Sequence, residues 1–251
     1  MPPRPGQANG SPELVVLLPP SEGKAIGGDG PAWTADTGQF AALARQRARI
    51  GSALARARGG NERLLGVGGA HLDRARVANC ELKTGPPSRP AAERYTGVVY
   101  DHLDLASLSR TARQRASASI IVLSGLLGAV GIDDPTPDYR LKMGASLAPL
   151  GKLSSWWRPT LSAALNERLA GCFVVDLLPQ EHRAAWLPEP GGCTLVKVSF
   201  VERDGKVAGH DAKAAKGLLV RHLMQSTGDS RRALERFAHE RFTLDLHRVE
   251  C

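Results

Sequence analysis

The chain has 251 residues and 42% of them are hydrophobic, so it can bury a sizeable core, and no apolar run is long enough to span a bilayer. The formal net charge of +8 favours anionic partners such as nucleic acid, nucleotides or phosphorylated substrates. The sequence is also rich in alanine, arginine and glycine, as a GC-rich genome produces without selection for function, so charge alone decides little.

The four cysteines and seven histidines show no spacing typical of a metal site, and no C-x-x-C pair occurs. This pattern favours a reduced, cytoplasmic chain without a metal or cofactor over a disulfide framework. The first twelve residues carry one arginine and no apolar stretch. We therefore expect a disordered tail at 1–12 and a single domain over 13–251.

The first predicted element is a buried strand over Glu13–Leu18 (ELVVLL), which Pro19 and Pro20 end. Ser21 and Lys24 follow directly, at the strand's carboxyl end, where open α/β sheets bind ligands. The spacing is not that of a Walker A loop. A lysine in this place can still hold a phosphate as a point charge or, when desolvated, act as a base.

A helix is predicted over 39–58. Its arginines fall on several faces, so we expect them to lie on a solvated surface rather than to form one stripe that binds a DNA groove. They are Arg45, Arg47, Arg49, Arg56 and Arg58.

Residues 61–78 predict two helices joined by a glycine-rich turn, Gly66-Val67-Gly68-Gly69. The pattern is like a helix-hairpin-helix element, whose turn points backbone N–H groups at a DNA phosphate. Gly66 and Gly68 are therefore candidate phosphate contacts. A plain glycine-rich turn between helices explains the pattern equally well.

Residues 91–104 contain the neighbours Asp101 and His102, which would form an acid–base pair only if their side chains met. Adjacent residues on a helix or strand point in different directions, so the sequence gives little support to such a pair.

The most β-like run, Ile120–Leu123, opens into a glycine- and proline-rich segment, Ser124–Gly144, after a predicted helix over 105–118. A buried strand that opens into a long irregular segment is a common place for chemistry in α/β proteins. The segment ends with Arg140 and Lys142, two cations that can hold an anion. An ordinary surface loop is the alternative.

The remaining predicted elements are a helix over 156–170, a buried strand over 172–178, a short helix over 180–186, and an alternating strand over 194–201. Asp204-Gly205 then predicts a tight antiparallel hairpin and hence a mixed sheet. A short basic helix and a strand at 242–246 end the chain.

A helix capped by Asp211 is predicted to run to residue 225. Lys213 and Lys216 share one of its faces with Val220, whereas Leu218 is expected on the apolar face. The two lysines repel each other unless an anion lies between them, which is weak evidence for an anion site.

Taken together, five stretches in order resemble the YaaA family, bacterial proteins linked to peroxide stress. They are Leu17–Lys24, Tyr95–Tyr100, Leu123–Gly144 (LSGLLGAV…YRLKMG), Val174–Trp186 and Ser199–Leu223 (SF…AKAAKGLLVRHL). The resemblance implies a single compact α/β fold with a central mixed sheet flanked by helices, a positively charged cleft, and a helix-hairpin-helix element that binds DNA. The cleft residues would be Lys24, Arg140, Lys142, Lys213 and Lys216.

Two functional hypotheses follow. In the first, the chain binds the DNA backbone without sequence preference in a peroxide stress response, through Lys24, Gly66, Gly68, Ser124, Arg140, Lys142, Lys213 and Lys216. In the second, it is an enzyme acting on a nucleotide, a nucleobase or another anionic small molecule, with Lys24, Ser21, Tyr139 and Arg140 as the catalytic residues.

Overall fold

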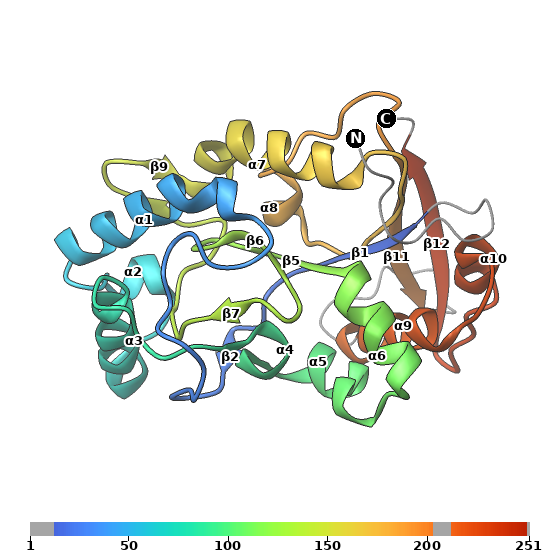
Figure 1. Ribbon diagram of the computed structural model, residues 1–251, viewed down its shortest axis with the longest axis horizontal. Helices are drawn as coiled ribbons and strands as arrows, with labels where there is room; N and C mark the ends of the chain where they lie inside the picture. The colour runs from blue at the N-terminus through green and yellow to red at the C-terminus, as the bar shows by residue number, and fades with distance from the viewer. Residues whose placement is uncertain (1–12, 203–211, 250–251) are drawn as a thin grey trace.

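The computed structural model describes residues 13–202 and 212–249, which form one compact α/β domain around a six-stranded sheet (Figure 1). The spatial order is β12-β11-β10-β1-β5-β6. The four inner strands are parallel to their inner neighbours, and the edge strands β6 and β12 pair antiparallel. The expected mixed sheet is confirmed. The bounds are β1 Leu14–Leu18, β5 Ile120–Ser124, β6 Gly128–Gly131, β10 Phe173–Asp176, β11 Thr194–Glu202 and β12 Phe242–Val249.

Helices cover both faces of this sheet (Figure 1). One face carries α1 (Ala44–Arg56) and α7 (Leu153–Leu169), and the other carries α5 (Val98–Leu103), α6 (Arg110–Ser119) and α9 (Ala212–Gln225). Because both faces are covered, every residue of β1, β5 and β10 is buried, which explains their unbroken aliphatic runs.

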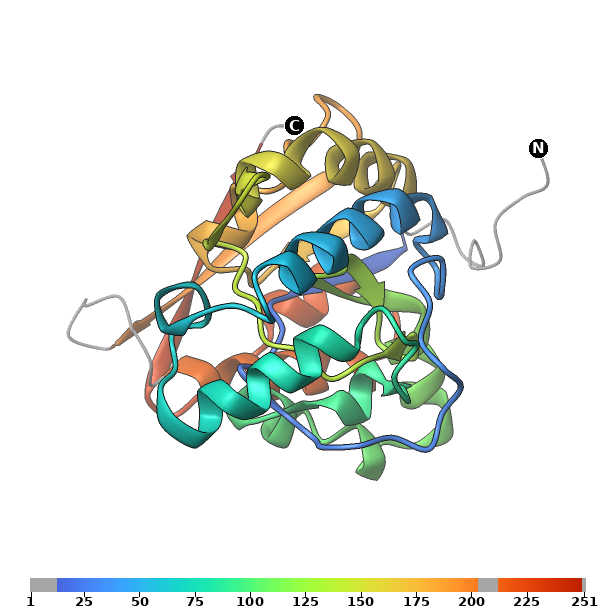
Figure 2. The ribbon, with the colours of Figure 1, turned by 90° about the vertical axis from the view of Figure 1, so that its left-hand side faces the viewer.

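Shorter elements surround this core. Figure 2 shows α3 lying beside α1 at the end of the molecule remote from β12. The helices are α2 Glu62–Leu65, α3 Gly69–Glu81, α4 Ala91–Arg94, α8 Gln180–Arg183 and α10 Ser230–Glu235, with 3₁₀ turns η1 Ala41–Leu43 and η2 Leu105–Ser107. The two-residue strands pair as β2 (Gly23–Lys24) with β4 (Tyr95–Thr96), β3 (Arg89–Pro90) with β7 (Pro135–Thr136), and β8 (Ser146–Leu147) with β9 (Gly151–Lys152). None of the helices in the described part of the chain is long and apolar enough to cross a bilayer.

Some expectations fall on residues that the structure does not describe. The tail at 1–12, the turn at Asp204-Gly205 and the cap at Asp211 all lie outside the described ranges. Among the described residues, the antiparallel partner of β11 is β12, with Glu202 opposite Phe242, so the last strand makes the sheet mixed at this edge.

The predicted faces of α9 were partly wrong. Val220 is fully buried, whereas Leu218 is 38% exposed. The reason is a close helix contact: a Cβ at Gly217 would lie 2.3 Å from the carbonyl oxygen of Val99, so α9 turns its glycine toward α5. The buried face is therefore centred on a residue without a side chain, which hydrophobic spacing does not reveal.

The prediction that all arginines of the first helix are solvated was wrong for Arg47. Its side chain is fully buried, although the four other arginines are exposed. Its guanidinium donates four hydrogen bonds of 2.8–3.0 Å to the carbonyl oxygens of Leu127, Ala129, Ala35 and Thr37. Burial lowers its pKa to about 10. Arg47 thus joins the loop before α1 to the turn between β5 and β6.

We predict that Arg47→Ala lowers the free energy of unfolding by about 3 kcal/mol, because buried carbonyl groups lose their donors. Arg45→Ala, a matched change on the exposed face of the same helix, should alter it by less than about 0.5 kcal/mol. Urea unfolding of both variants measures the difference, and equal effects would contradict this role of Arg47.

Candidate functional site

A pocket of about 420 Å³ lies where β1 and β10 end, beside α5 and α9. In the sheet, β1 lies between β5, the next long strand in the sequence, and β10, which comes later. The strand order therefore reverses direction at β1, and open α/β sheets bind ligands at such a switch point. We call this the β1–β10 pocket. Its lining comes from residues 19–22, 24, 97–100, 140–142, 179, 181, 182, 213 and 216.

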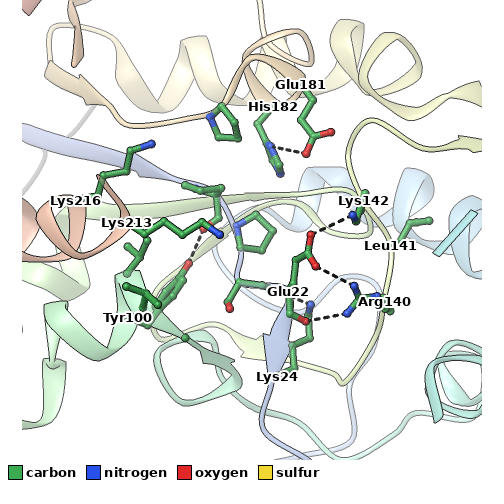
Figure 3. A pocket seen from close by; sticks show the side chains of 17 residues that line it. Glu22, Lys24, Tyr100, Arg140, Leu141, Lys142, Glu181, His182, Lys213 and Lys216 are labelled. Atoms are coloured by element: carbon green, nitrogen blue, oxygen red, sulfur yellow. Dashed lines mark hydrogen bonds and ion pairs between the residues drawn. The ribbon is translucent and has the colours of Figure 1, made fainter. Parts of the chain in front are cut away.

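All five cations that the family resemblance assigns to a cleft line this pocket (Figure 3): Lys24, Arg140, Lys142, Lys213 and Lys216. They come from three distant parts of the chain. Lys24 lies shortly after β1, Arg140 and Lys142 lie in the long segment after β5, and the other two lysines lie in α9. The lining also holds two carboxylates, Glu22 and Glu181. Cations therefore outnumber carboxylates in the lining. That these cations hold an external anion stays a prediction.

The carboxylate of Glu22 bridges two of the cations. Its Oε2 lies 3.0 Å from Nη2 of Arg140, and its Oε1 lies 3.1 Å from Nζ of Lys142. Partial burial raises the pKa of Glu22, but the hydrogen bonds and charges of Lys142 and Arg140 outweigh this effect and lower it. The Glu22 side chain is 66% exposed, so the bridge is open to solvent.

Arg140 is held in place from the side of the α2–α3 unit. Its Nε donates to the carbonyl oxygen of Leu65 at 3.0 Å. Its backbone N–H donates to Oδ1 of Asn79 at 2.9 Å, and the Asn79 amide donates to the Arg140 carbonyl at 2.9 Å and to that of Gly59 at 2.8 Å. Asn79 is fully buried in α3. Sequence reasoning missed it, since one asparagine in a helix gives no sign of its distant partner.

Lys24 lies at the edge of the pocket against two tyrosine rings. Its Nζ is 4.3 Å from the ring centroid of Tyr139 and 5.6 Å from that of Tyr95, and it donates to the carbonyl oxygen of Ser21 at 3.0 Å. Burial lowers the pKa of Lys24 to about 7, although the negative charge of Asp138 opposes this. An amine in this state can give or accept a proton at neutral pH.

Ser124 and Tyr139 serve the structure around the pocket rather than its lining. The Tyr139 hydroxyl lies 2.6 Å from Oγ of Ser124 and 2.9 Å from the hydroxyl of Tyr95. Ser124 is fully buried and accepts from the N–H groups of Leu126 and Leu127 at 3.2 Å, so it shapes the turn after β5 and lies away from any surface that an anion reaches. Burial raises the pKa of Tyr139 to about 12, which keeps its hydroxyl protonated.

The other predicted site residues lie nearby. Ser21 lines the pocket, and its hydroxyl donates to the carbonyl oxygen of Thr96. Gly66 ends α2 with a positive φ of 65°. A Cβ at Gly66 would lie 3.2 Å from Nζ of Lys142, so the turn borders the pocket without lining it. Gly68 precedes α3 and lies beside the Glu62 carboxylate.

Asp101 and His102 do not pair. The Asp101 carboxylate accepts from the N–H of Gly97 at 3.4 Å, and Nδ1 of His102 lies 2.8 Å from the carbonyl oxygen of Val98. Both partners are local backbone groups, one at the N-cap of α5 and one in its first turn.

A second cavity, of about 260 Å³, lies on the other side of Lys24 and shares Glu22 and Arg140 with the β1–β10 pocket. Helix α3 contributes His71 and Arg74 to it, and Arg74 forms a 2.9 Å ion pair with Asp138. Within 13–202 and 212–249, no group of three or more His, Cys, Asp and Glu side chains is placed to hold a metal ion.

Comparison with known proteins gives the family of the chain. A family model described as peroxide stress protein YaaA matches residues 14–247. A UPF0246 protein of Streptomyces coelicolor is 41% identical over 84% of this chain and 83% of its own length. A UPF0246 protein of Corynebacterium glutamicum, strain ATCC 13032, is 31% identical over 88% of this chain and 89% of its own length. One of Methylibium petroleiphilum is 35% identical over 66% of this chain and 68% of its own length.

The chain belongs to the peroxide stress protein YaaA family. The family match covers every strand of the central sheet, although β12 extends two residues past it, and all of the pocket lining. The resemblance that the sequence motifs predicted is therefore confirmed.

We predict that the Lys24 amine of this YaaA family member titrates with a midpoint near pH 7, well below its ordinary value of 10.5. Because the folded pKa is lowered, the unfolded chain binds this proton between pH 7 and 10.5 and the folded chain does not. Lys24 therefore costs stability below pH 7, and this cost falls as pH rises through that window. NMR of ε-¹³C-labelled lysines measures the titration. The step must vanish in Lys24→Met, and a Lys24 signal that still carries its proton at pH 9 would contradict the account.

Proposed function

We propose that this YaaA family member binds a small anionic ligand bearing a phosphate or carboxylate group in the β1–β10 pocket. The observation that carries the proposal is the Glu22 bridge. A carboxylate of the protein already occupies the space between Arg140 and Lys142, which is the interaction that a ligand anion would make.

The surroundings of this bridge support the same conclusion. Lys213 has no carboxylate partner within the described residues, and Lys216 donates only to the carbonyl oxygen of Leu177, at 3.4 Å. Burial and the charge of Arg183 lower the pKa of Lys216. Such a cluster of cations is stabilised by an anion among them. The pocket volume lies within the range of about 300–1,000 Å³ that is typical of small-molecule sites.

Lys24 gives this pocket a group suited to proton transfer. Its pKa of about 7 is near the pH at which a general acid or base works best, and Arg140 would hold the anion of a substrate close by. On this basis we propose an enzyme that acts on a nucleotide, a nucleobase or another anionic small molecule. Lys24 would be its acid–base residue, Arg140 would bind the anion, and Ser21 would lie at the pocket edge. The role in peroxide stress that the family's description names is proposed for this chain as well.

Arg140→Ala should weaken binding of phosphorylated ligands by about tenfold or more, because it removes a charge-assisted hydrogen bond. Titration calorimetry at low salt with ribose 5-phosphate and nucleoside monophosphates measures this effect. Lys152→Ala is the control, since it removes an exposed cation outside the pocket. If Arg140→Ala and wild type bind these phosphorylated ligands with equal affinity, the proposal is wrong.

DNA-backbone binding is the second candidate, and a separate observation favours it. The 13-residue helix α3 begins after Gly68 without a side-chain cap and without an acidic residue in its first turn, so its first N–H groups can meet a phosphate. The turn lies beside Lys142. A phosphate there would have to displace the neighbouring Glu62 carboxylate.

This second candidate predicts steep salt dependence and no sequence preference. In fluorescence anisotropy with labelled duplexes of unrelated sequence, Lys142→Ala should reduce the slope of log affinity against log salt by about 1, and Lys152→Ala should leave it unchanged. If both variants retain the wild-type slope while ribose 5-phosphate binding depends on Arg140, the DNA candidate is wrong and the small-molecule proposal stands.

A further inference from the structure

A buried histidine lines the β1–β10 pocket without a hydrogen-bond partner. His182, in the short helix α8 after β10, is 5% exposed, and neither ring nitrogen forms a hydrogen bond within the described part of the chain. The Oε1 atom of Glu181 lies 3.7 Å from Nδ1 of His182, which is beyond hydrogen-bond distance. Buried polar atoms left without partners cost about 1–3 kcal/mol each, so they usually have a reason.

The position of His182 supplies that reason. Figure 3 shows its ring extending from α8 into the same space that Glu22 and Lys213 enter from other sides. Buried groups elsewhere near the site, such as Asn79 and Ser124, have their partners within the chain. A molecule that fills the pocket would supply the partner that the buried His182 nitrogens do not find among the described residues.

The imidazole of His182 is uncharged. Burial lowers its pKa to about 4, so at neutral pH one ring nitrogen donates a hydrogen bond and the other accepts one. Such a group suits an uncharged polar edge that both donates and accepts. It does not suit a phosphate, for which the pocket already provides lysine and arginine.

Apolar groups make up much of the remaining lining: Val98, Val99, Leu141, Pro179 and Pro20. The pocket therefore combines cations that suit an anionic group with apolar surface and one neutral donor–acceptor. A sugar phosphate alone would leave the apolar surface and the imidazole without contacts. A flat heteroaromatic ring with a polar edge would contact the apolar surface with its face and the imidazole with its edge.

We propose that the ligand of the β1–β10 pocket is a nucleoside monophosphate and that His182 recognises the hydrogen-bonding edge of its base. This proposal rests on the proposed anion-binding function, since Arg140, Lys142 and the α9 lysines hold the phosphate. His182 is assigned as a specificity-determining residue, and no bond is made or broken by it.

The test compares two kinds of probe: nucleoside monophosphates, and ribose 5-phosphate, which carries the phosphate but no base. AMP, GMP, CMP and UMP are titrated calorimetrically against ribose 5-phosphate, with wild type, His182→Phe and His182→Gln. We expect the best nucleotide to bind wild type at least tenfold more tightly than ribose 5-phosphate. His182→Phe should lose that preference while its affinity for ribose 5-phosphate stays within twofold of wild type. His182→Gln, which keeps a donor and an acceptor, should recover part of the preference.

Three results would overturn the proposal. The first is binding of ribose 5-phosphate and every nucleotide with equal affinity, which leaves the anion-binding function intact. The second is an equal loss of both probes in His182→Phe, the result expected of a merely structural role. The third is binding of neither probe, which removes the anion-binding function as well. As a measurement without substitution, the ¹⁵N signals of the wild-type His182 ring should shift on adding the nucleotide and stay in place with ribose 5-phosphate.

Discussion

The arrangement of the site depends on the two ion pairs that the Glu22 carboxylate forms with Arg140 and Lys142. This carboxylate joins the segment that follows β1 to the segment that follows β5, through Arg140 and Lys142. Without a negative charge at this point, two cations on one short segment would face three lysines from β2 and α9 across a small pocket. An exposed carboxylate on a loop can hold these cations and can also leave them, whereas a buried one could not.

The backbone around this interaction is fixed from a different direction. Asn79 holds the backbone of Arg140 to α3, and the Leu65 carbonyl holds its guanidinium to α2. An arginine held by hydrogen bonds beside an exposed carboxylate suits ligand exchange, because the binding group is already oriented before the ligand arrives. Lys24 and His182 complete the site with two groups whose charges burial reduces, one by lowering a lysine pKa to about 7 and one by keeping an imidazole neutral.

Much of the fold was predictable because its signals are local. The aliphatic runs of β1, β5 and β10 predicted buried strands, and the motifs around Lys24, Arg140 and Lys213 predicted both the family and the side chains that converge. Position at a strand's carboxyl end is a strong guide, since the sheet brings these ends together.

The remainder depends on long-range contacts that sequence spacing does not encode. Arg47 was expected in solvent, but it is surrounded by four carbonyl groups, two from the loop before α1 and two from the turn and strand after β5. Ser124 was predicted among the anion-binding residues, and in the fold its buried hydroxyl lies 2.6 Å from that of Tyr139, 15 residues away. His182 was not singled out, because a lone histidine in a short helix is most often an ordinary core or surface residue, and only the pocket shows that its nitrogens lack partners.

The central claim is that Glu22 stands in for the anion of a ligand. Replacing its carboxylate by an uncharged amide of the same shape, Glu22→Gln, removes the competing charge and leaves the cations in place. Calorimetric titration with sulfate, whose charge is constant near neutral pH, measures the consequence. The account predicts that Glu22→Gln binds sulfate several-fold more tightly than wild type. Unchanged or weaker binding by the variant would contradict it.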